Sequence, residues 1–376
     1  MLKIKPKLRF PEFDGEWEEK QLSTILEIGT GKSKVQSNES GKYNILGSTG
    51  IIGKSHTYDY EGDFILTARV GHYAGKLYKH AGKVNISDNT IYLFNFINKN
   101  FIYESLNAFK SEKLVFGSGQ PLIKASDLKK LKIRVPVSKE QKKIGGFFSK
   151  LDRQIELEEQ KLEKLEEQKK GYMQKIFSQE LRFKDDNGNS YPDWSIKKIE
   201  DISKVNKGFT PNTKNDEYWD ELNENWLSIA GMTQKYLYKG NKGITEKGAS
   251  KHVKVDKDTL IMSFKLTLGK LAIVKEPIYT NEAICHFVWK ESNVNTEYMY
   301  YYLNSINIST FGAQAVKGVT LNNDSINSII VKLPVIQEQN KIAYFFNELD
   351  KLIRKQYAKI ELLKQRKNGL LQKMFV

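Results

Sequence analysis

The chain has 376 residues, of which 39% are hydrophobic and 11% aromatic, so it can form two or three packed domains and is not a wholly disordered chain. Its apolar runs are far shorter than the ~20 residues that span a bilayer, its N-terminus lacks the apolar segment of a secretory signal, and its single cysteine excludes an internal disulfide. A net charge of +15 indicates a polyanionic partner. We therefore expect a cytoplasmic protein without membrane contact.

The first predicted domain covers residues 1–137. Strand-like runs separated by glycine-bearing turns lie at residues 64–66, 82–86, 90–94 and 131–135. Residues 102–114 have a helical pattern. This order of short strands and a helix is typical of a mixed α/β sheet domain.

A long helix is predicted next, over residues 138–180. Pro136 stands just before it, where proline is tolerated. Apolar residues then recur at alternating spacings of four and three, the pattern of a coiled-coil face. At ~1.5 Å per residue the stretch from Ile144 to Ile176 is about 50 Å long, more than one ~34–36 Å turn of B-DNA. A helix of this length can act as a spacer.

The same plan returns in the second half of the chain. Residues 181–335 predict a second mixed domain, with strands at 259–262 and 271–274 and a helix at 296–305. Residues 336–376 predict a second long helix, again preceded by a proline, Pro334.

The two helices are copies of one another. Residues 131–177 and 329–375 align without gaps at an offset of 198, and their identities include Pro136/Pro334, Glu140/Glu338, Phe148/Phe346, Asp152/Asp350, Lys175/Lys373 and Phe177/Phe375. Each globule opens with Leu-Arg-Phe followed by a tryptophan, Trp17 in the first and Trp194 in the second. The chain is therefore an internal duplication in which the helices stayed alike and the globules diverged.

The helix copies carry polar residues at the same two seam positions, which suggests how they pair. The seam residues that we single out are Leu151, Ile155, Glu158, Leu162, Leu165, Lys169, Leu349, Ile353, Gln356, Ile360, Leu363 and Lys367. An antiparallel register with Glu158 opposite Lys367 and Lys169 opposite Gln356 matches polar with polar positions throughout. The alternative is two separate helices, each packed on its own globule.

Basic, hydroxyl and amide side chains gather in the predicted loops of both globules. Such groups suit phosphate contacts, and arginine, lysine and glutamine also reach base edges. The candidate DNA-binding residues are Lys32, Lys34, Arg69, His72, Tyr73, Lys76, Ser118, Gln120, Lys124, Lys207, Thr210, Lys265, Thr267, Lys270 and Lys317. A solvated surface is the alternative for any one of them.

Catalytic motifs are absent from the sequence. Residues 28–33 read IGTGKS, but a phosphate-binding loop needs glycine where Leu26 stands. The five histidines have no metal-ligand spacing. No Asp/Asn-Pro-Pro-aromatic run of an amino-methyltransferase occurs. We expect no catalytic residue, no metal and no cofactor in this chain.

The repeated helices and the opening that reads Phe-Pro-Glu-Phe up to Trp17 resemble the specificity subunit of type I restriction–modification systems, over essentially the whole length. The resemblance implies an α+β fold, in which two mixed α/β target-recognition domains are separated by two long helices that form an antiparallel coiled coil. It also implies that each domain reads one half of a bipartite double-stranded DNA target and that the helices set the spacing.

The partners that the resemblance implies carry the chemistry. Two modification subunits with S-adenosylmethionine bind mainly to the helices, and restriction subunits driven by ATP and Mg²⁺ complete the nuclease. The second domain departs mildly from the pattern, because its 20 basic residues barely exceed its 18 acidic residues. The alternatives are a fused methyltransferase or nuclease and a free-standing DNA- or RNA-binding protein without a methyltransferase partner.

Overall fold

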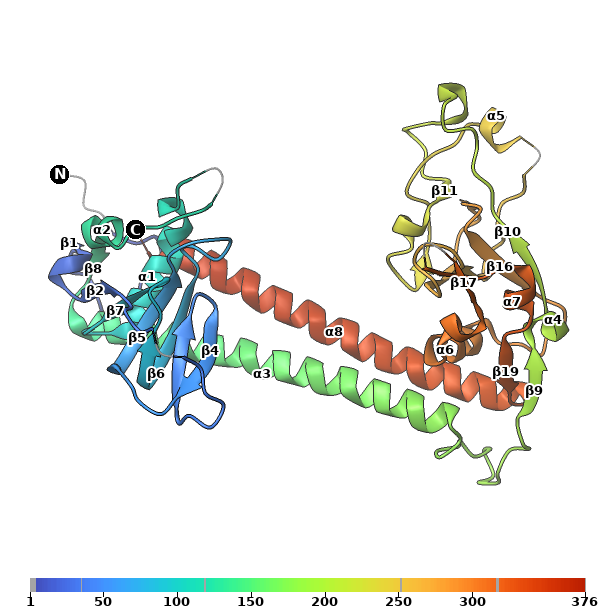
Figure 1. The fold of residues 1–376 in the computed structure, drawn as a ribbon, viewed down its shortest axis with the longest axis horizontal. Helices are drawn as coiled ribbons and strands as arrows, with labels where there is room; N and C mark the ends of the chain where they lie inside the picture. Colours follow the sequence, from blue (N-terminus) through green and yellow to red (C-terminus); the bar gives the residue numbers. More distant parts are fainter. Residues whose placement is uncertain (1–4, 35, 118–119, 251, 316–317, 376) are drawn as a thin grey trace. The chain divides into compact units, whose positions relative to one another are not determined.

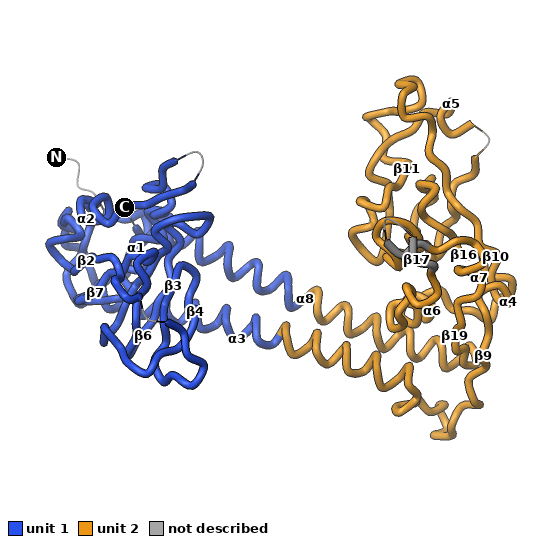
Figure 2. The backbone as a smooth tube through the Cα atoms, in the orientation of Figure 1, with its two compact units in different colours: residues 1–161, 356–376 blue, residues 162–355 orange. Residues whose placement is uncertain are grey.

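The computed structural model describes residues 5–34, 36–117, 120–250, 252–315 and 318–375. The chain forms two compact units, one made of Met1–Lys161 with Gln356–Val376 and the other of Leu162–Lys355 (Figure 2). Each unit therefore takes one stretch from each long helix. The four-part division expected from the sequence, with boundaries at 137, 180 and 335, stays a prediction.

Unit 1 contains a curved sheet, a small two-stranded sheet and helices (Figure 1). Its strands are β1 (Glu18–Gln21), β2 (Glu27–Thr30), β3 (Tyr43–Gly47), β4 (Gly50–Ser55), β5 (Tyr60–Ala68), β6 (Leu77–Ile86), β7 (Thr90–Phe94) and β8 (Lys132–Val135). Its helices are α1 (Lys99–Phe109), α2 (Ala125–Lys130) and the first part of α3 (Ser138–Phe177). The last turns of α8 (Ile336–Met374) also belong to it.

Unit 2 is built in the same way. Its strands are β9 (Ser195–Lys198), β10 (Ser203–Lys207), β11 (Trp226–Leu227), β12 (Tyr236–Leu237), β13 (Leu260–Ser263), β14 (Leu271–Val274), β15 (Tyr279–Thr280), β16 (Ile284–Trp289), β17 (Ala313–Ala315), β18 (Gly318–Thr320) and β19 (Ile330–Leu333). Besides the parts of α3 and α8, its helices are α4 (Ile199–Ile202), α5 (Glu246–Ala249), α6 (Thr296–Ser305) and α7 (Asn323–Asn327).

The two main sheets share the order and direction of five strands, although the globules barely match in sequence and β4 adds a sixth strand in unit 1. Unit 1 has the order β2-β7-β5-β6-β3-β4 and unit 2 the order β10-β16-β13-β14-β12. In both sheets the neighbours are antiparallel except for one parallel pair, β3 with β6 and β12 with β14. A small antiparallel sheet, β1 with β8 or β9 with β19, stands beside each. The expected fold class, α+β with two mixed domains and an antiparallel helix pair, is confirmed.

One predicted helix ends earlier than the sequence pattern suggested. The helix expected at 102–114 is α1, which ends at Phe109 because Lys110 adopts a left-handed conformation with φ of 61°. A short 3-10 turn, Ser111–Leu114, continues from there. The predicted helix at 296–305 and strand at 90–94 coincide with α6 and β7.

Stretches of the two long helices run antiparallel within each unit and enter its core. In unit 1, Phe148 near the start of α3 packs against Phe375 after the end of α8, with ring centroids 5.9 Å apart. In unit 2, Phe346 of α8 and Phe177 of α3 stack at 5.8 Å. These are the duplicated phenylalanines, so the same aromatic contact is made twice. The alternative of two separate helices, each on its own globule, is therefore wrong.

The polar pairing along the helices differs from the predicted register. In unit 1, Lys367 pairs with Asp152 at 2.5 Å, while Glu158 accepts hydrogen bonds from Gln356 at 2.6 Å and from Lys359 at 2.5 Å. The expected pairing of Glu158 with Lys367 is therefore wrong.

The aspartates beside the seam, Asp152 and Asp350, supply the missing counter-charge. Lys169 pairs in unit 2 with Asp350 at 2.6 Å, the duplicate of the Lys367 contact with Asp152, so its expected pairing with Gln356 is wrong as well. All twelve predicted seam residues are buried or half-buried.

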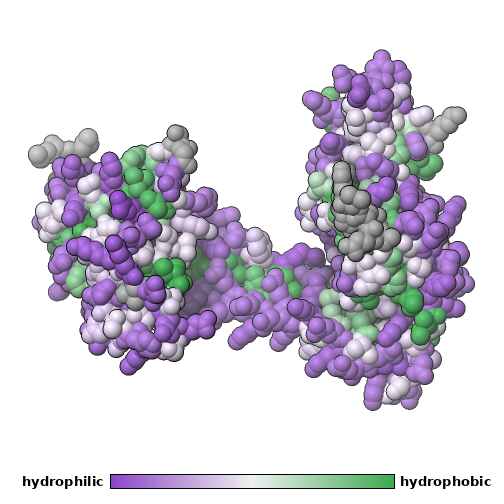
Figure 3. Space-filling view, viewed as in Figure 1, coloured by the Kyte–Doolittle hydropathy of each residue, from purple (hydrophilic) through white to green (hydrophobic). Residues whose placement is uncertain are grey.

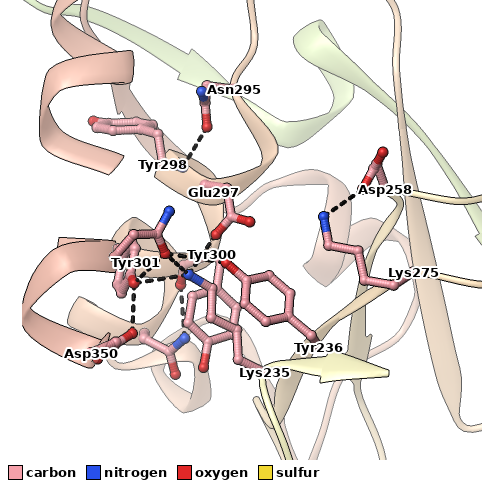
Figure 4. A network of polar contacts seen from close by, with 12 residues as sticks. Lys235, Tyr236, Asp258, Lys275, Asn295, Glu297, Tyr298, Tyr300, Tyr301 and Asp350 are labelled. Atoms are coloured by element: carbon pink, nitrogen blue, oxygen red, sulfur yellow. Dashed lines mark hydrogen bonds and ion pairs between the residues drawn. The ribbon is translucent and has the colours of Figure 1, made fainter. Parts of the chain in front are cut away.

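A polar network in unit 2 joins the sheet, α6 and α8 (Figure 4). The Lys235 ammonium lies 2.5 Å from Glu297 and donates to the Tyr301 hydroxyl at 2.8 Å. Tyr301 in turn donates to Asp350 at 2.6 Å. Burial lowers the pKa of Lys235. The network fixes the globule on the helix through charge-assisted hydrogen bonds in a desolvated setting.

Unit 1 has a related polar contact between its helix α1 and the long helix α8. Glu104 of α1 is buried and accepts a hydrogen bond from Lys367 of α8 at 3.0 Å. Burial raises the pKa of Glu104, and the Lys367 ammonium opposes that shift. Different residue types therefore join the equivalent helix of each globule to the long helices.

The duplicated opening and the duplicated glutamate form one buried junction in each unit. In unit 1, Arg9 donates two hydrogen bonds of 2.7 Å to the Glu140 carboxylate, and the Trp17 indole donates a third at 3.3 Å. Glu140 is 0% exposed. The hydrogen bond to Glu140 raises the pKa of Arg9. The Leu-Arg-Phe opening is thereby tied to the first turn of α3.

Unit 2 repeats the junction with its own residues. Arg182 donates to Glu338 at 3.2 and 2.8 Å, and the Trp194 indole donates at 2.9 Å. Glu338 is also 0% exposed. The arginine, the tryptophan and the glutamate are the same in both copies because a buried carboxylate needs all its hydrogen bonds.

Among the described residues, no helix combines the length and the apolar composition needed to cross a membrane.

We predict that Glu140→Gln and Glu338→Gln each loosen only their own unit. Each substitution removes the charge of a fully buried carboxylate and leaves a largely buried arginine without its partner, at a cost of about 3–5 kcal/mol in the free energy of unfolding. Backbone amide exchange in β1 and β8 measures the effect in unit 1, and exchange in β9 and β19 measures it in unit 2. Glu159→Gln on the exposed face of α3 is the control, with an expected cost below about 1 kcal/mol. Equal exchange in Glu140→Gln and Glu159→Gln would contradict the role of the junction.

Candidate nucleic-acid interface

The predicted loops of unit 1 are tied together by backbone hydrogen bonds. The Arg69 amide donates to the Asn89 carbonyl at 2.8 Å, and the Arg69 carbonyl accepts from the Ile123 amide at 2.9 Å. The Gly71 amide donates to the Pro121 carbonyl at 2.8 Å. The segments 69–76 and 120–124 therefore lie side by side, next to the turn between β6 and β7. We call this the first loop cluster, together with residues 31–34.

The side chains of this cluster combine cations with exposed aromatic rings. Tyr73 is 49% exposed, and the Lys76 ammonium lies 4.9 Å from the centre of its ring. The Lys124 ammonium lies 4.7 Å from the Phe116 ring, which is also exposed. Arg69 is exposed between its two backbone anchors. Cations and exposed aromatic faces held on fixed backbone suit a nucleic acid.

The two lysines after β2 join the same cluster. The Gly31 amide donates to the Thr90 carbonyl at 2.9 Å and the Ser33 amide to the Ile86 carbonyl at 3.0 Å. Lys32 and Lys34 are exposed on either side of Ser33. His72 and Gln120 are exposed as well, and Ser118 lies outside the described residues. The structure thus brings together the described candidates of the first globule.

Unit 2 presents a second loop cluster, formed by residues 207–210 and 264–270. The Phe209 amide donates to the Thr280 carbonyl at 2.8 Å, and the Phe264 amide to the Ala283 carbonyl at 3.0 Å. The Lys207 ammonium stands 4.5 Å and the Lys265 ammonium 5.7 Å from the centre of the Phe264 ring. Two cations from separate segments therefore converge on one buried phenylalanine.

Two candidates of this cluster are already engaged within the protein. The Thr210 hydroxyl donates to Glu282 and accepts from Asn281. Lys270 is half-buried, and its ammonium lies 3.5 Å from the Ile229 carbonyl oxygen. Lys265 and Thr267 are exposed, whereas Lys317 lies outside the described residues. The predicted DNA-binding residues of this cluster whose side chains are exposed are therefore Lys207, Lys265 and Thr267.

The two clusters occupy equivalent places in their units. Each contains a glycine directly after a strand, Gly31 after β2 and Gly208 after β10, where a Cβ atom would clash with a carbonyl oxygen of the adjacent backbone. In unit 1 the Arg69 carbonyl, just after β5, accepts a hydrogen bond from the Ile123 amide, which lies before α2. In unit 2 the Phe264 carbonyl, just after β13, accepts one from the Leu321 amide, which lies before α7. The backbone frame is shared, and the side chains that it displays differ.

Mainly hydrophilic residues cover the visible face of both units, with scattered apolar patches (Figure 3). Within the described residues, no group of three histidine, cysteine, aspartate or glutamate side chains is arranged to hold a metal ion. Sequence reasoning missed Phe264, because a phenylalanine at the end of a strand is expected to serve the core, as this one also does. The available signal was its place directly before Lys265, between two strands.

Comparisons with known proteins agree with this architecture. The family model described as the type I restriction modification DNA specificity domain matches residues 14–167 and 191–363. The chain is 30% identical over 209 residues to the MjaIX type I restriction enzyme specificity subunit of Methanocaldococcus jannaschii, across 53% of this chain and 48% of that relative. The match thus spans about half of that relative's length. It is 24% identical over 334 residues to the MjaVIII specificity subunit of the same organism, across 80% of this chain and 76% of the relative.

Solved structures share the fold at low sequence identity. The S subunit of a type I restriction–modification system from M. genitalium has a TM-score of 0.64 at 16% identity, with 99% of both chains covered. A chain from a study of complex assembly and conformational transition in the type I R-M system has a TM-score of 0.60 at 12% identity, covering 95% of this chain and 97% of that one. The family model covers both halves of the chain, and the chain therefore belongs to the type I restriction modification DNA specificity family.

Proposed function

We propose that this chain is the DNA sequence-specificity subunit of a type I restriction–modification enzyme, in which each loop cluster reads one half of a bipartite target. The observation that carries this proposal is the pair of equivalent loop clusters, which share a backbone frame and differ in the side chains displayed. A shared frame suits one kind of ligand, and different side chains suit different base sequences.

The helices have a separate role in this proposal. They set the spacing between the half-sites and dock two modification subunits, which carry S-adenosylmethionine and methylate DNA. Restriction subunits that use ATP and Mg²⁺ join this complex. The chain itself contributes recognition and no catalysis. Family membership and the absence of catalytic motifs from the sequence support this division of labour.

Co-expression with a modification subunit of a type I restriction–modification system tests the proposed function. We expect the two proteins to purify together and to transfer methyl groups from S-adenosylmethionine to DNA at a defined sequence. The modification subunit alone is the control and lacks that sequence preference. Failure of the pair to purify together and to methylate DNA would contradict the proposal. Sequence-specific binding by the chain alone, with no modification partner, would favour a free-standing DNA- or RNA-binding protein.

Arg69 tests base reading by the first loop cluster. Arg69→Ala removes an exposed side chain whose backbone is held on both sides by Asn89 and Ile123, so the fold is retained. If Arg69 reads a base edge, we expect a loss of ~1–3 kcal/mol in binding free energy and relaxed specificity at one position of one half-site. Methylation of a library of randomised sites measures both. A uniform loss across all sequences would make Arg69 a phosphate contact.

A further inference from the structure

The hairpin that joins β13 to β14 in unit 2 has a rigid base and a short projecting tip. The Ser263 amide donates to the Lys270 carbonyl at 2.9 Å, and the Gly269 amide donates to the Ser263 carbonyl at 2.8 Å. The Ser263 hydroxyl accepts from the Lys270 amide at 3.0 Å and donates to the Thr267 carbonyl. These contacts close the base of the hairpin and leave Lys265, Leu266 and Thr267 at its tip.

Leu266 is an apolar side chain held out into solvent. It is 91% exposed and has a φ of 64°, in the left-handed region that leucine rarely adopts. Non-glycine residues persist in this conformation where the surrounding structure enforces it, and they concentrate at binding sites. Here the closed base of the hairpin and the anchored Phe264 below the tip enforce it.

The charges around Leu266 indicate the kind of surface that it meets. Lys265 adjoins it in the chain, and Lys207 converges with Lys265 on the ring of Phe264. By contrast, Leu222 is 95% exposed in the same unit, but its neighbours include Asp220, Glu221 and Glu224. Acidic neighbours repel a phosphate backbone and basic neighbours attract it. Of these two exposed leucines, Leu266 is therefore the one whose neighbouring charges suit DNA.

We infer that Leu266 reads a thymine in the half-site recognised by unit 2, through contact with its C5-methyl group. The inference rests on the proposed function of the chain. In the major groove the thymine methyl is the apolar group that a base pair presents, and apolar side chains recognise it. Lys207 and Lys265 bind the flanking phosphates and hold the tip against the base edge. Burial of the leucine and of the methyl group supplies the preference for thymine over cytosine and uracil.

Replacing thymine with uracil in the target isolates this contact, because it removes one methyl group and leaves base pairing intact. The complex of the chain with its modification subunit is first tested for preference between target and random duplexes. Each thymine of the unit 2 half-site is then replaced in turn, and equilibrium competition measures affinity. For the wild type we expect one position at which uracil lowers affinity about fourfold, the size expected for one buried methyl group.

Three variants make the assignment specific. Leu266→Ala is expected to bind the thymine and uracil duplexes equally at that position, with unchanged thermal unfolding because the side chain is exposed. Leu266→Met keeps an apolar side chain of similar length and is expected to keep the preference for thymine. Leu222→Ala is the matched control and is expected to behave as the wild type.

The outcomes separate this inference from the proposed function. If the wild-type complex has no preference between target and random duplexes, both fail, and this appears before any uracil is introduced. If it prefers the target but tolerates uracil at every position, or if Leu266→Ala keeps the thymine preference, only the Leu266 inference is overturned. Equal loss of affinity by Leu266→Ala for every duplex would instead make Leu266 a wedge between base steps.

Discussion

A buried carboxylate sits beneath an arginine and a tryptophan at the start of each long helix, and the arrangement of each unit depends on this contact. Glu140 and Glu338 are both withdrawn completely from solvent and are satisfied by side chains from the opening of their own globule. A desolvated carboxylate tolerates little change in its partners. The junction therefore defines where each globule begins on the helix, whatever sequence follows in the globule.

This constraint explains why the two halves of the chain diverged unequally. Several of the residues that stayed identical meet at the junction or between helix stretches, such as Phe148 and Phe375 in unit 1 and Phe346 and Phe177 in unit 2. The sheet needs only apolar residues at its buried positions, so its sequence drifted while its strand order was kept. The loops bear the least structural constraint and hold the differences that recognition requires.

Sequence patterns predicted the parts of this fold that rest on periodicity and repetition. The helices, their antiparallel association and several strands follow from spacing, because one face of each must be apolar. The register of the helices does not follow, because Asp152 and Asp350 lie beside the apolar seam and reach Lys367 and Lys169 from there. The matching strand order of the sheets could not be read either, since a run of apolar residues does not say which strand it pairs with.

The candidate interface was predicted by residue type and only in part by position. Lysines and Arg69 were identifiable because basic side chains suit phosphate contacts and lie in predicted loops. The engagement of Thr210 with Glu282 depends on contacts made across 72 positions of sequence, and no local pattern carries that information. Leu266 was passed over for the opposite reason, because its apolar side chain looks like part of a core until its exposure is known.

Genome-wide mapping of DNA methylation after a domain exchange tests most directly whether the globules read independently on a common scaffold. Residues 8–130 are replaced by the globule of another family member that retains the arginine and tryptophan of the junction, and the modification subunit is supplied with the hybrid chain. Independent reading predicts a bipartite methylated sequence in which one half changes while the other half and the spacing stay the same. Changes in both halves, or a contiguous methylated sequence, would contradict the account.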